Sequence, residues 1–441
     1  MVTSVQQDNL RARPAIDKWH LPVTPSKSGY LREKRAAMIT FSHFPDDPRP
    51  RRAAEALVQE GMAVDLICLA KDHEIPRREV LNGIDVLRVP IRRRREGKFR
   101  YAYEYSAFLL ASSVMLALRS LTRGYDLVYV HNMPDILVFS SLVPKALGAK
   151  VILDLHDPMP ELMRTNFNFH QNDLTIRFLK QLEKWSIRCA DAVVTVNLAC
   201  KRIFSSRSCR PEKIRVVMNS PDEQIFPFRS ADSAAPGTRT MEKPFVIMYH
   251  GTIVPRNGLD LAIAALAELR KTVPIAELRV YGAATPFLEQ LMHTARNNGV
   301  HEAIRYLGPK RLEDLVLEID QCDVGIIPNH RNIFTEINTP TRILEYLALG
   351  KPVIAPRAPG IQDYFEEDSL VFFELGNSGD LARKIEHVYR HQDETTEIVK
   401  RGQEVYLRHT WRKQRETLVE LIADLLRVQG SGDDVSCVGL S

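Results

Sequence analysis

Short apolar runs alternate with helical patterns along most of this 441-residue chain. In the first half we predict strands at 36–41, 64–69, 85–89, 127–130, 151–155, 192–196 and 214–217. In the second half we predict strands at 245–249, 278–281, 304–307, 324–327, 352–355 and 370–373. Between residues 258 and 271, apolar residues recur at the period of one helix face. Short apolar strands separated by helices predict an α/β fold, with a parallel sheet covered on both faces in each half.

A change in composition divides the chain into two domains. Residues 221–244 are rich in proline, serine and charge and lack periodicity, which is typical of a linker. We therefore predict an N-terminal Rossmann-like domain at 31–220 and a second Rossmann-like domain at 245–410. A helix is expected at 411–428. The chain ends, 1–30 and 429–441, are polar, so we expect a disordered N-terminal tail and a flexible C-terminal tail.

The composition excludes several classes of protein. With 44% hydrophobic and 26% charged residues, the chain resembles an ordinary soluble globular protein. Its six cysteines show neither paired nor zinc-binding spacing, so we expect reduced thiols in a reducing compartment. The first 30 residues lack an apolar signal core, which favours a cytoplasmic location.

The net charge of +5 is unevenly distributed. A basic cluster directly precedes the apolar run 107–118, which is shorter than the roughly 20 residues of a spanning helix. A basic cluster beside a buried or interfacial apolar helix is typical of peripheral contact with an anionic membrane. A solvated loop is the alternative, and no nucleic-acid-binding module surrounds the cluster. The candidate membrane or acceptor surface consists of Arg92, Arg93, Arg94, Arg95, Lys98 and Arg100.

The segment 338–355 combines helix signals with residues suited to an anionic ligand. Thr339 is a good N-cap, a proline follows it, and Gly350 suits the left-handed end of a helix. Arg342 and Glu345 are three residues apart, so they share a face near the positive end of the helix dipole. Phosphates could bind the guanidinium and the free N–H groups there, and hydroxyls could donate to the carboxylate. An ordinary surface helix with an ion pair is the alternative.

The pattern Pro-x-Arg-x-x-Glu-Tyr-Leu-Ala-x-Gly-x-Pro-Val-Ile-Ala in this segment resembles the donor-binding segment of GT-B glycosyltransferases. The closest likeness is to the large retaining family 4, also called glycosyl transferases group 1. The resemblance implies two Rossmann-like domains that face each other across a cleft, with the C-terminal helix returning to the first domain. It also implies that Glu345 holds the ribose hydroxyls of a nucleotide-sugar.

Ligands of such sheets bind at the carboxyl ends of the strands, so catalytic and binding residues are expected directly after each strand. The segment 42–53 resembles the opening loop of one branch of the family and is expected to offer Arg49 and Arg52 to the cleft. His131 and His156 each stand at the end of a predicted strand, in the contexts His-Asn-x-Pro-Asp and Asp-x-His-Asp-x-x-Pro-Glu. A lone histidine is usually structural. The resemblance implies that these two face the transferred sugar and the acceptor.

The segment 249–258 departs from the family pattern. Gly251 would let the backbone approach a phosphate. Many relatives carry a cation at each of the positions occupied here by Thr252 and Asn257, so Arg256 and Arg342 are the remaining candidates for binding the diphosphate.

The family's upstream glutamate is also missing from this chain. Ile337 stands eight residues before Glu345, and Glu336 is displaced by one position and expected to face elsewhere.

Taken together, these patterns predict a cytoplasmic, metal-independent retaining glycosyltransferase without a cofactor. Its partners would be a nucleotide-diphosphate sugar and a glycan or lipid-linked acceptor, in polysaccharide or glycoconjugate biosynthesis. No Asp-x-Asp metal pair is present. The expected catalytic residues are His131, His156, Arg256, Arg342 and Glu345. The expected donor-binding residues are Gly251, Thr252, Gly282, Pro309, Thr341, Arg342 and Glu345.

Two alternatives stay open at this point. The same fold hosts nucleotide-sugar epimerases. A non-catalytic relative that acts as scaffold or regulator is the other candidate, and Thr252 and Asn257 support it.

Overall fold

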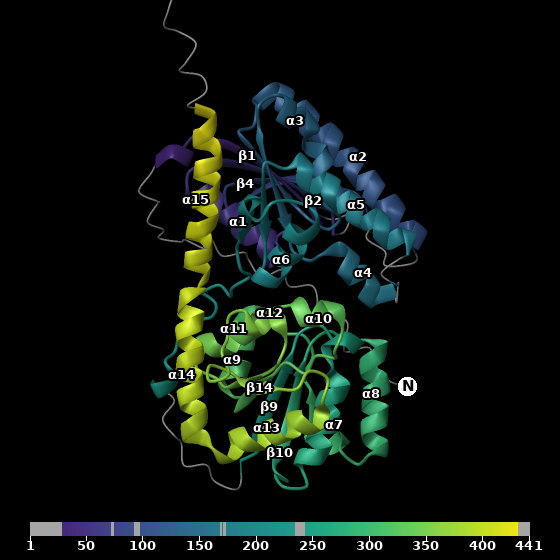
Figure 1. Ribbon diagram of the computed structural model, residues 1–441, viewed down its shortest axis with the longest axis vertical. Helices are drawn as coiled ribbons and strands as arrows, with labels where there is room; N and C mark the ends of the chain where they lie inside the picture. The colour runs from purple at the N-terminus through teal and green to yellow at the C-terminus, as the bar shows by residue number, and fades with distance from the viewer. Residues whose placement is uncertain are drawn as a thin grey trace, which may run out of the picture.

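Two α/β domains lie one above the other along the long axis of the molecule, each with a sheet between layers of helices (Figure 1). The computed structural model describes residues 29–71, 75–91, 98–167, 170, 173–233 and 243–430. The predicted arrangement of two Rossmann-like domains is confirmed.

The first domain contains an eight-stranded sheet in the order β3-β4-β2-β1-β5-β6-β7-β8. Its strands are β1 (Arg35–His43), β2 (Ala63–Leu69), β3 (Arg78–Leu81), β4 (Ile84–Val89), β5 (Leu127–His131), β6 (Lys150–Leu155), β7 (Ala192–Thr195) and β8 (Ile214–Val216). All neighbours pair in parallel except β3 and β4. The edge strand β3 was not predicted, because it is short and two of its four residues are charged.

The helices of the first domain cover this sheet. They are η2 (Gly29–Leu31), α1 (Pro48–Gln59), α2 (Lys98–Arg123), η3 (Asp135–Ser141), α3 (Leu142–Ala146), α4 (Met159–Phe167), α5 (Leu174–Cys189), α6 (Leu198–Arg207) and η4 (Pro211–Lys213). The predicted N-terminal tail lies outside the described residues up to residue 28. Leu31, in η2, is buried in the core of the first domain.

Helix α2 is much longer than the apolar run that predicted it. An 18-residue window within 103–123 has a mean hydropathy of 1.3, enough by length and composition for a membrane span. One face of α2 nevertheless packs on the sheet, where the rings of Tyr105 and Phe108 contact Phe41 at centroid distances of 4.9 and 5.2 Å. The helix therefore packs on the folded domain through this face.

The second domain contains a six-stranded parallel sheet in the order β11-β10-β9-β12-β13-β14. Its strands are β9 (Phe245–His250), β10 (Ala276–Tyr281), β11 (Ile304–Tyr306), β12 (Val324–Ile326), β13 (Val353–Pro356) and β14 (Val371–Phe373). Its helices are η6 (Pro255–Asn257), α7 (Leu259–Leu269), α8 (Pro286–Asn297), η7 (His301–Ala303), α9 (Leu312–Asp320), α10 (Ile333–Ile337), α11 (Thr341–Ala348), α12 (Pro359–Gln362), α13 (Ser378–Arg390) and α14 (Gln392–Arg408).

The predicted linker is partly folded onto the second domain. Phe226 and Ala231, in and beside η5 (Ala231–Ser233), are buried in its core, and Arg229 N donates to Ala348 O at 2.8 Å. Residues 234–242 lie outside the described residues.

The C-terminal helix returns to the first domain, as predicted. Helix α15 (Trp411–Gly430) runs beside α1 and contributes Leu418, Ile422 and Leu426 to the core of that domain (Figure 1). Arg415 on this helix also pairs with the buried Glu60.

Candidate active site between the two domains

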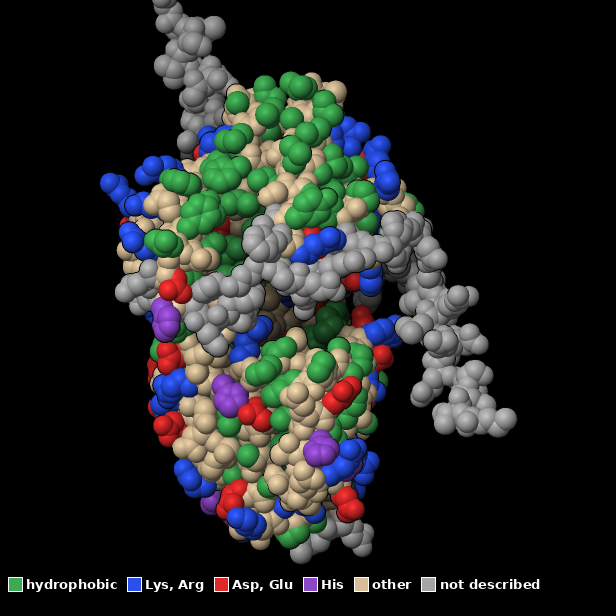
Figure 2. Space-filling view, turned by 90° about the vertical axis from the view of Figure 1, so that its right-hand side faces the viewer, with side chains coloured by type: hydrophobic (Ala, Val, Ile, Leu, Met, Phe, Trp, Pro, Cys, Tyr) green, Lys and Arg blue, Asp and Glu red, His purple; other side chains and the backbone are tan. Residues whose placement is uncertain are grey.

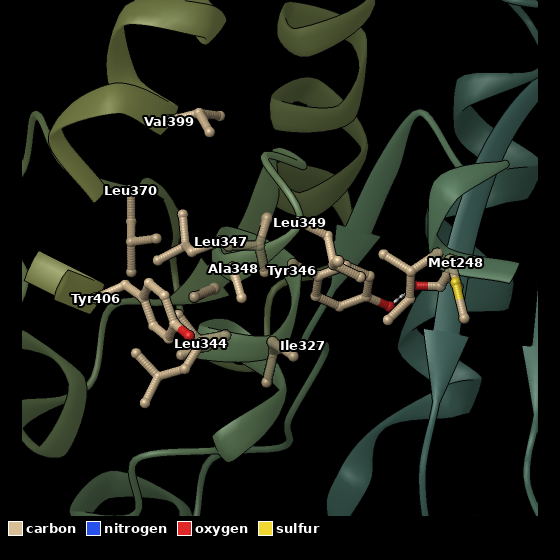
Figure 3. Packing of buried hydrophobic residues seen from close by; sticks show 14 of the residues in the cluster. Met248, Ile327, Leu344, Tyr346, Leu347, Ala348, Leu349, Leu370, Val399 and Tyr406 are labelled. Carbon is tan, nitrogen blue, oxygen red and sulfur yellow. Dashed lines mark hydrogen bonds between the residues drawn. The ribbon is translucent and has the colours of Figure 1, made fainter. Parts of the chain in front are cut away.

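Helix α11 is anchored so that its first turn faces the first domain. Its apolar face packs Leu344, Leu347 and Ala348 into the core of the second domain, together with Tyr406 (Figure 3). The N-cap is Pro340, which makes no side-chain cap. The prediction that Thr339 caps this helix was therefore wrong, because the Thr339 hydroxyl donates instead to Gly360 O at 2.6 Å.

Arg342 and Glu345 both contact His250, the last residue of β9. Arg342 Nη1 donates to the carbonyl of His250 at 2.6 Å, and Glu345 Oε2 lies 2.7 Å from the imidazole Nε2. The guanidinium also lies over the ring of Tyr249, 5.6 Å from its centroid. A strand end 92 residues away thus holds the cation and the carboxylate of α11 in fixed positions.

The other side of the His250 ring is held by a buried tyrosine. Its Nδ1 lies 2.8 Å from the hydroxyl of Tyr346, which in turn lies 3.1 Å from Met248 O (Figure 3). The hydroxyl can donate either to the carbonyl or to Nδ1, and in both arrangements a proton lies between Nε2 and the Glu345 carboxylate. One carboxylate oxygen is thereby fixed, and the other is left to accept from a ligand hydroxyl.

Two glycines that were predicted to bind the donor follow β9 and β10. At both, neighbouring groups lie so close to the backbone that a side chain would not fit without a shift. Gly251 has a φ of +123°, and a Cβ there would lie 3.3 Å from Arg342 Nη1. A Cβ at Gly282 would lie 2.2 Å from Gly251 O. Gly282 N donates to Gly308 O at 3.1 Å, directly before Pro309, so three strand ends form one continuous backbone rim. Thr341, the remaining predicted donor residue, is half-buried as the first residue of α11.

Thr252 and Asn257, which occupy the positions of the two family cations, are joined by a hydrogen bond. Asn257 Nδ2 donates to Thr252 O at 2.7 Å, and the Tyr249 hydroxyl donates to the same oxygen at 3.1 Å. Asn257 therefore shapes this loop. Arg256 lies over the ring of Phe334, 5.7 Å from its centroid.

The two predicted histidines lie together at the end of the first-domain sheet. His131 Nδ1 is 3.1 Å from His156 Nε2 and 3.3 Å from Asp154 Oδ2. Burial lowers the pKa of His156 to about 3, although Asp154 acts in the opposite direction, so the ring is neutral at physiological pH. His131 is fully buried, and its Nε2 has no hydrogen-bond partner among the described residues. His156 is the member of the pair whose side chain stays partly exposed, by 21%.

Arg49 and Arg52, which were expected to offer their charges to the cleft, are both buried. Arg49 donates to both oxygens of the buried Asp154 and to Val217 O. Burial acts to raise the pKa of Asp154, but the charge of Arg49 holds it well below its usual range. Arg52 donates to Ser220 O and lies over the ring of Trp411, 5.0 Å from its centroid. Both guanidiniums therefore make buried contacts with other residues of the chain.

The ligand atoms of His131, Asp154 and His156 lie within 4.8 Å of one another, close enough to share a metal ion. Asp154 Oδ2, however, already accepts from Arg49 Nε at 3.0 Å and from the Tyr129 hydroxyl at 2.9 Å. A metal cation would also lie close to the Arg49 guanidinium, and like charges repel strongly in a buried site. The contacts favour a hydrogen-bonded network over a metal centre.

Asp157 is a candidate residue that the sequence analysis did not select. It follows His156 at the end of β6, and burial raises the pKa of its carboxyl to about 6. The charges of Arg256 and Arg49 act in the opposite direction, which places Arg256 of the second domain within electrostatic reach of Asp157 in the first. A histidine and an aspartate of one domain therefore face a cation of the other.

Direct contacts hold the domains together beside this site. Asn197, the N-cap of α6, donates through Nδ2 to Ile337 O at 2.9 Å and to the Thr339 hydroxyl at 3.1 Å. Arg202 on α6 pairs with Asp363 at 2.6 Å. The Asn197 contacts link the first domain to the loop that leads into α11, and the Arg202 pair links it to the end of α12.

The residues not yet described are Glu336 and the candidate surface cations. Glu336 pairs with the exposed Arg331 at 3.3 Å. Of the candidate surface cations, Arg92–Arg95 lie outside the described residues and Lys98 begins α2. Arg100 is exposed and pairs with Glu104 at 2.8 Å.

Comparison with known families covers both domains. Residues 48–220 match the family described as Glycosyl transferase 4-like domain, and residues 232–405 match Glycosyl transferases group 1. Glycogen synthase from Mycobacterium tuberculosis is 27% identical over 186 residues, 42% of each chain. D-inositol 3-phosphate glycosyltransferase from Saccharomonospora viridis is 23% identical over 243 residues, 53% of this chain and 55% of that protein. The chain thus spans about half the length of these curated relatives.

Solved structures share the fold over nearly the whole chain. Sucrose-phosphate synthase from Thermosynechococcus elongatus superposes with a TM-score of 0.73 at 16% identity, covering 90% of this chain and 100% of that one. HepE from Anabaena, in complex with UDP-glucose, has a TM-score of 0.65 at 15% identity, covering 88% and 99%.

Proposed function

The chain belongs to the GT-B glycosyltransferases of group 1, and from this premise we propose that it uses a nucleotide-diphosphate sugar as donor. The glycosyl group would pass, with retention of configuration, to a hydroxyl of a glycan or lipid-linked acceptor. The observation that carries the proposal is the convergence of Arg342 and Glu345 on His250. It places a cation for phosphate and a carboxylate for hydroxyls on one turn of α11.

In the proposed reaction the bond between the anomeric carbon and the diphosphate oxygen breaks, and its electron pair stays on the diphosphate. The acceptor hydroxyl oxygen forms the new bond on the same face, and its proton passes to the departing diphosphate. Negative charge therefore grows on the leaving group, where Arg342, Arg256 and the uncapped start of α11 can stabilise it. No metal and no further cofactor takes part in this scheme.

Each domain has a separate task in this proposal. Glu345, held by His250, accepts from the ribose hydroxyls in the second domain. In the first domain, the neutral His156 and the carboxylate of Asp157 orient the acceptor and the sugar. His131 supports His156 from its fully buried position.

Titration calorimetry with UDP, GDP and ADP tests the proposal. Saturable binding of one nucleotide at micromolar concentration is expected, and it would also identify the base. A non-catalytic relative is the second candidate, because Asn257 and Thr252 bind each other instead of providing two cations. Failure of all three nucleotides to bind would favour that candidate. Turnover of a sugar nucleotide without any acceptor would favour an epimerase.

A further inference from the structure

Helices α2, α3 and α5 form one outer face of the first domain, and this face carries most of the exposed large hydrophobic side chains of the described residues. On α2 these are Tyr103, near its start, and the four residues Leu110, Val114, Leu118 and Leu121, each at least 50% exposed. The last four form a row. Their spacing of four, four and three residues places them along one side of the helix. The opposite side of α2, with the buried Phe108, packs on the sheet.

Helix α5 repeats this arrangement beside α2. Leu174, Phe178 and Trp185 are exposed by 78%, 58% and 46%, whereas Ile176 and Ile187 are fully buried. Leu142 and Leu147, at the two ends of α3, add to the same surface. Figure 2 shows this side of the whole molecule. Hydrophobic side chains are spread over the first domain there, with Lys and Arg side chains at the margins. An apolar patch of this extent on a folded domain marks an interaction site.

The exposed charges within helices α2, α3 and α5 are of one sign. Glu104 is the sole acidic residue in the sequence of α2 and Glu183 the sole one in α5, and both are fully buried and paired with arginine. The exposed charged residues of α5 are Arg177, Lys184 and Arg188. In the sequence, the cluster of cations at 92–100 leads directly into α2.

We propose that the face formed by α2, α3 and α5 docks on the surface of a bilayer that contains anionic lipid. Apolar side chains flanked by cations, with an exposed tryptophan and tyrosine, fit the boundary between headgroups and acyl chains. The same one-sided charge argues against a second copy of this chain as the occupant, because a two-fold contact would bring the cations together. The proposal does not depend on the transferase activity.

Sedimentation with vesicles tests this inference on the full-length protein. The wild type should pellet with vesicles of phosphatidylcholine and phosphatidylglycerol, more weakly with phosphatidylcholine alone, and less as salt is raised. The double variant Leu110→Ser/Leu118→Ser should lower vesicle affinity about tenfold. Leu317→Ser/Leu407→Ser, which changes two exposed leucines of the second domain, is the matched control and should bind like the wild type.

A second pair of substitutions keeps the test decisive if the α2 variant does not fold. Phe178→Ser/Trp185→Ser on α5 should also weaken binding about tenfold. Absence of vesicle binding by the wild type, or unchanged binding by the folded variants, would overturn the proposal. A dimer in solution that these variants convert to a monomer would overturn it in favour of an interface between copies. Nucleotide titration on the same samples reports separately on the donor site.

Discussion

Nε2 of His250 lies 2.7 Å from Oε2 of Glu345, which joins the end of strand β9 to helix α11. The carbonyl oxygen of the same histidine accepts a hydrogen bond from Arg342, and its Nδ1 contacts the hydroxyl of Tyr346. A ribose-binding carboxylate and a phosphate-binding guanidinium are thus positioned by one residue. His250 is buried, so we regard it as a positioning residue.

Replacing His250 should weaken nucleotide binding without removing it. His250→Ala frees Glu345 from its fixed position, and we expect the Kd of the bound nucleotide to rise about tenfold, the loss of one charge-assisted hydrogen bond. His250→Gln, which keeps an N–H near the position of Nε2, should recover part of that affinity. Calorimetry on both variants checks this. Equal affinities for Ala, Gln and wild type would contradict it.

Asp157 should make nucleotide affinity depend on pH. Because burial raises its pKa to about 6, the carboxyl is neutral below that pH and negative above it. Above pH 6 its charge opposes a diphosphate and competes for Arg256. Asp157→Asn should therefore bind about three- to tenfold more tightly than wild type at pH 8, and equally well at pH 5. Comparing both proteins in the same buffers cancels the titration of the nucleotide. A constant affinity ratio would refute the prediction.

The contact of Asn197 with the second domain should favour the closed cleft. Asn197→Ser keeps an oxygen that can cap α6 but removes the amide that donates to Ile337 O and Thr339 Oγ1. Loss of two hydrogen bonds should shift the equilibrium towards the open form by about 1–2 kcal/mol. Small-angle scattering should then show a larger radius of gyration. Asn377→Ser, which changes the N-cap of α13, is the matched control.

The buried pair of Arg49 and Asp154 should be important for stability. Arg49→Met leaves the Asp154 carboxylate without its main partner, and breaking such a buried pair costs about 3–5 kcal/mol. Lys71→Met breaks the exposed pair with Asp46 and should change stability by less than about 1 kcal/mol. Urea unfolding of both variants gives the comparison. Similar midpoints for the two would show that Arg49 is not needed in the core.

Much of this architecture could be predicted from the sequence because period and position determine it. Every predicted strand occurs, and His131, His156 and Gly251 stand at or directly after the ends of β5, β6 and β9. His250 carried the same signal as the two selected histidines, a place at the end of a strand, and could have been found by it.

The features that the sequence did not reveal depend on contacts between distant residues. Arg49 lies 105 residues from Asp154, and no local pattern shows that its charge is used there. Thr339 has the chemistry of an N-cap, yet a carbonyl of α12 competes for its hydroxyl. The pKa of Asp157 follows from burial between two domains. The apolar face of α2 required knowledge of which side packs on the sheet.

The most direct test of the central claim is nucleotide titration of Glu345→Ala beside Glu336→Ala. Glu336 lies nine residues earlier and pairs with the exposed Arg331, so its loss controls for removal of a nearby carboxylate. The proposed ribose contact predicts that Glu345→Ala raises the Kd by about tenfold or more, while Glu336→Ala binds like the wild type. Equal affinity of Glu345→Ala and wild type for the nucleotide would contradict it.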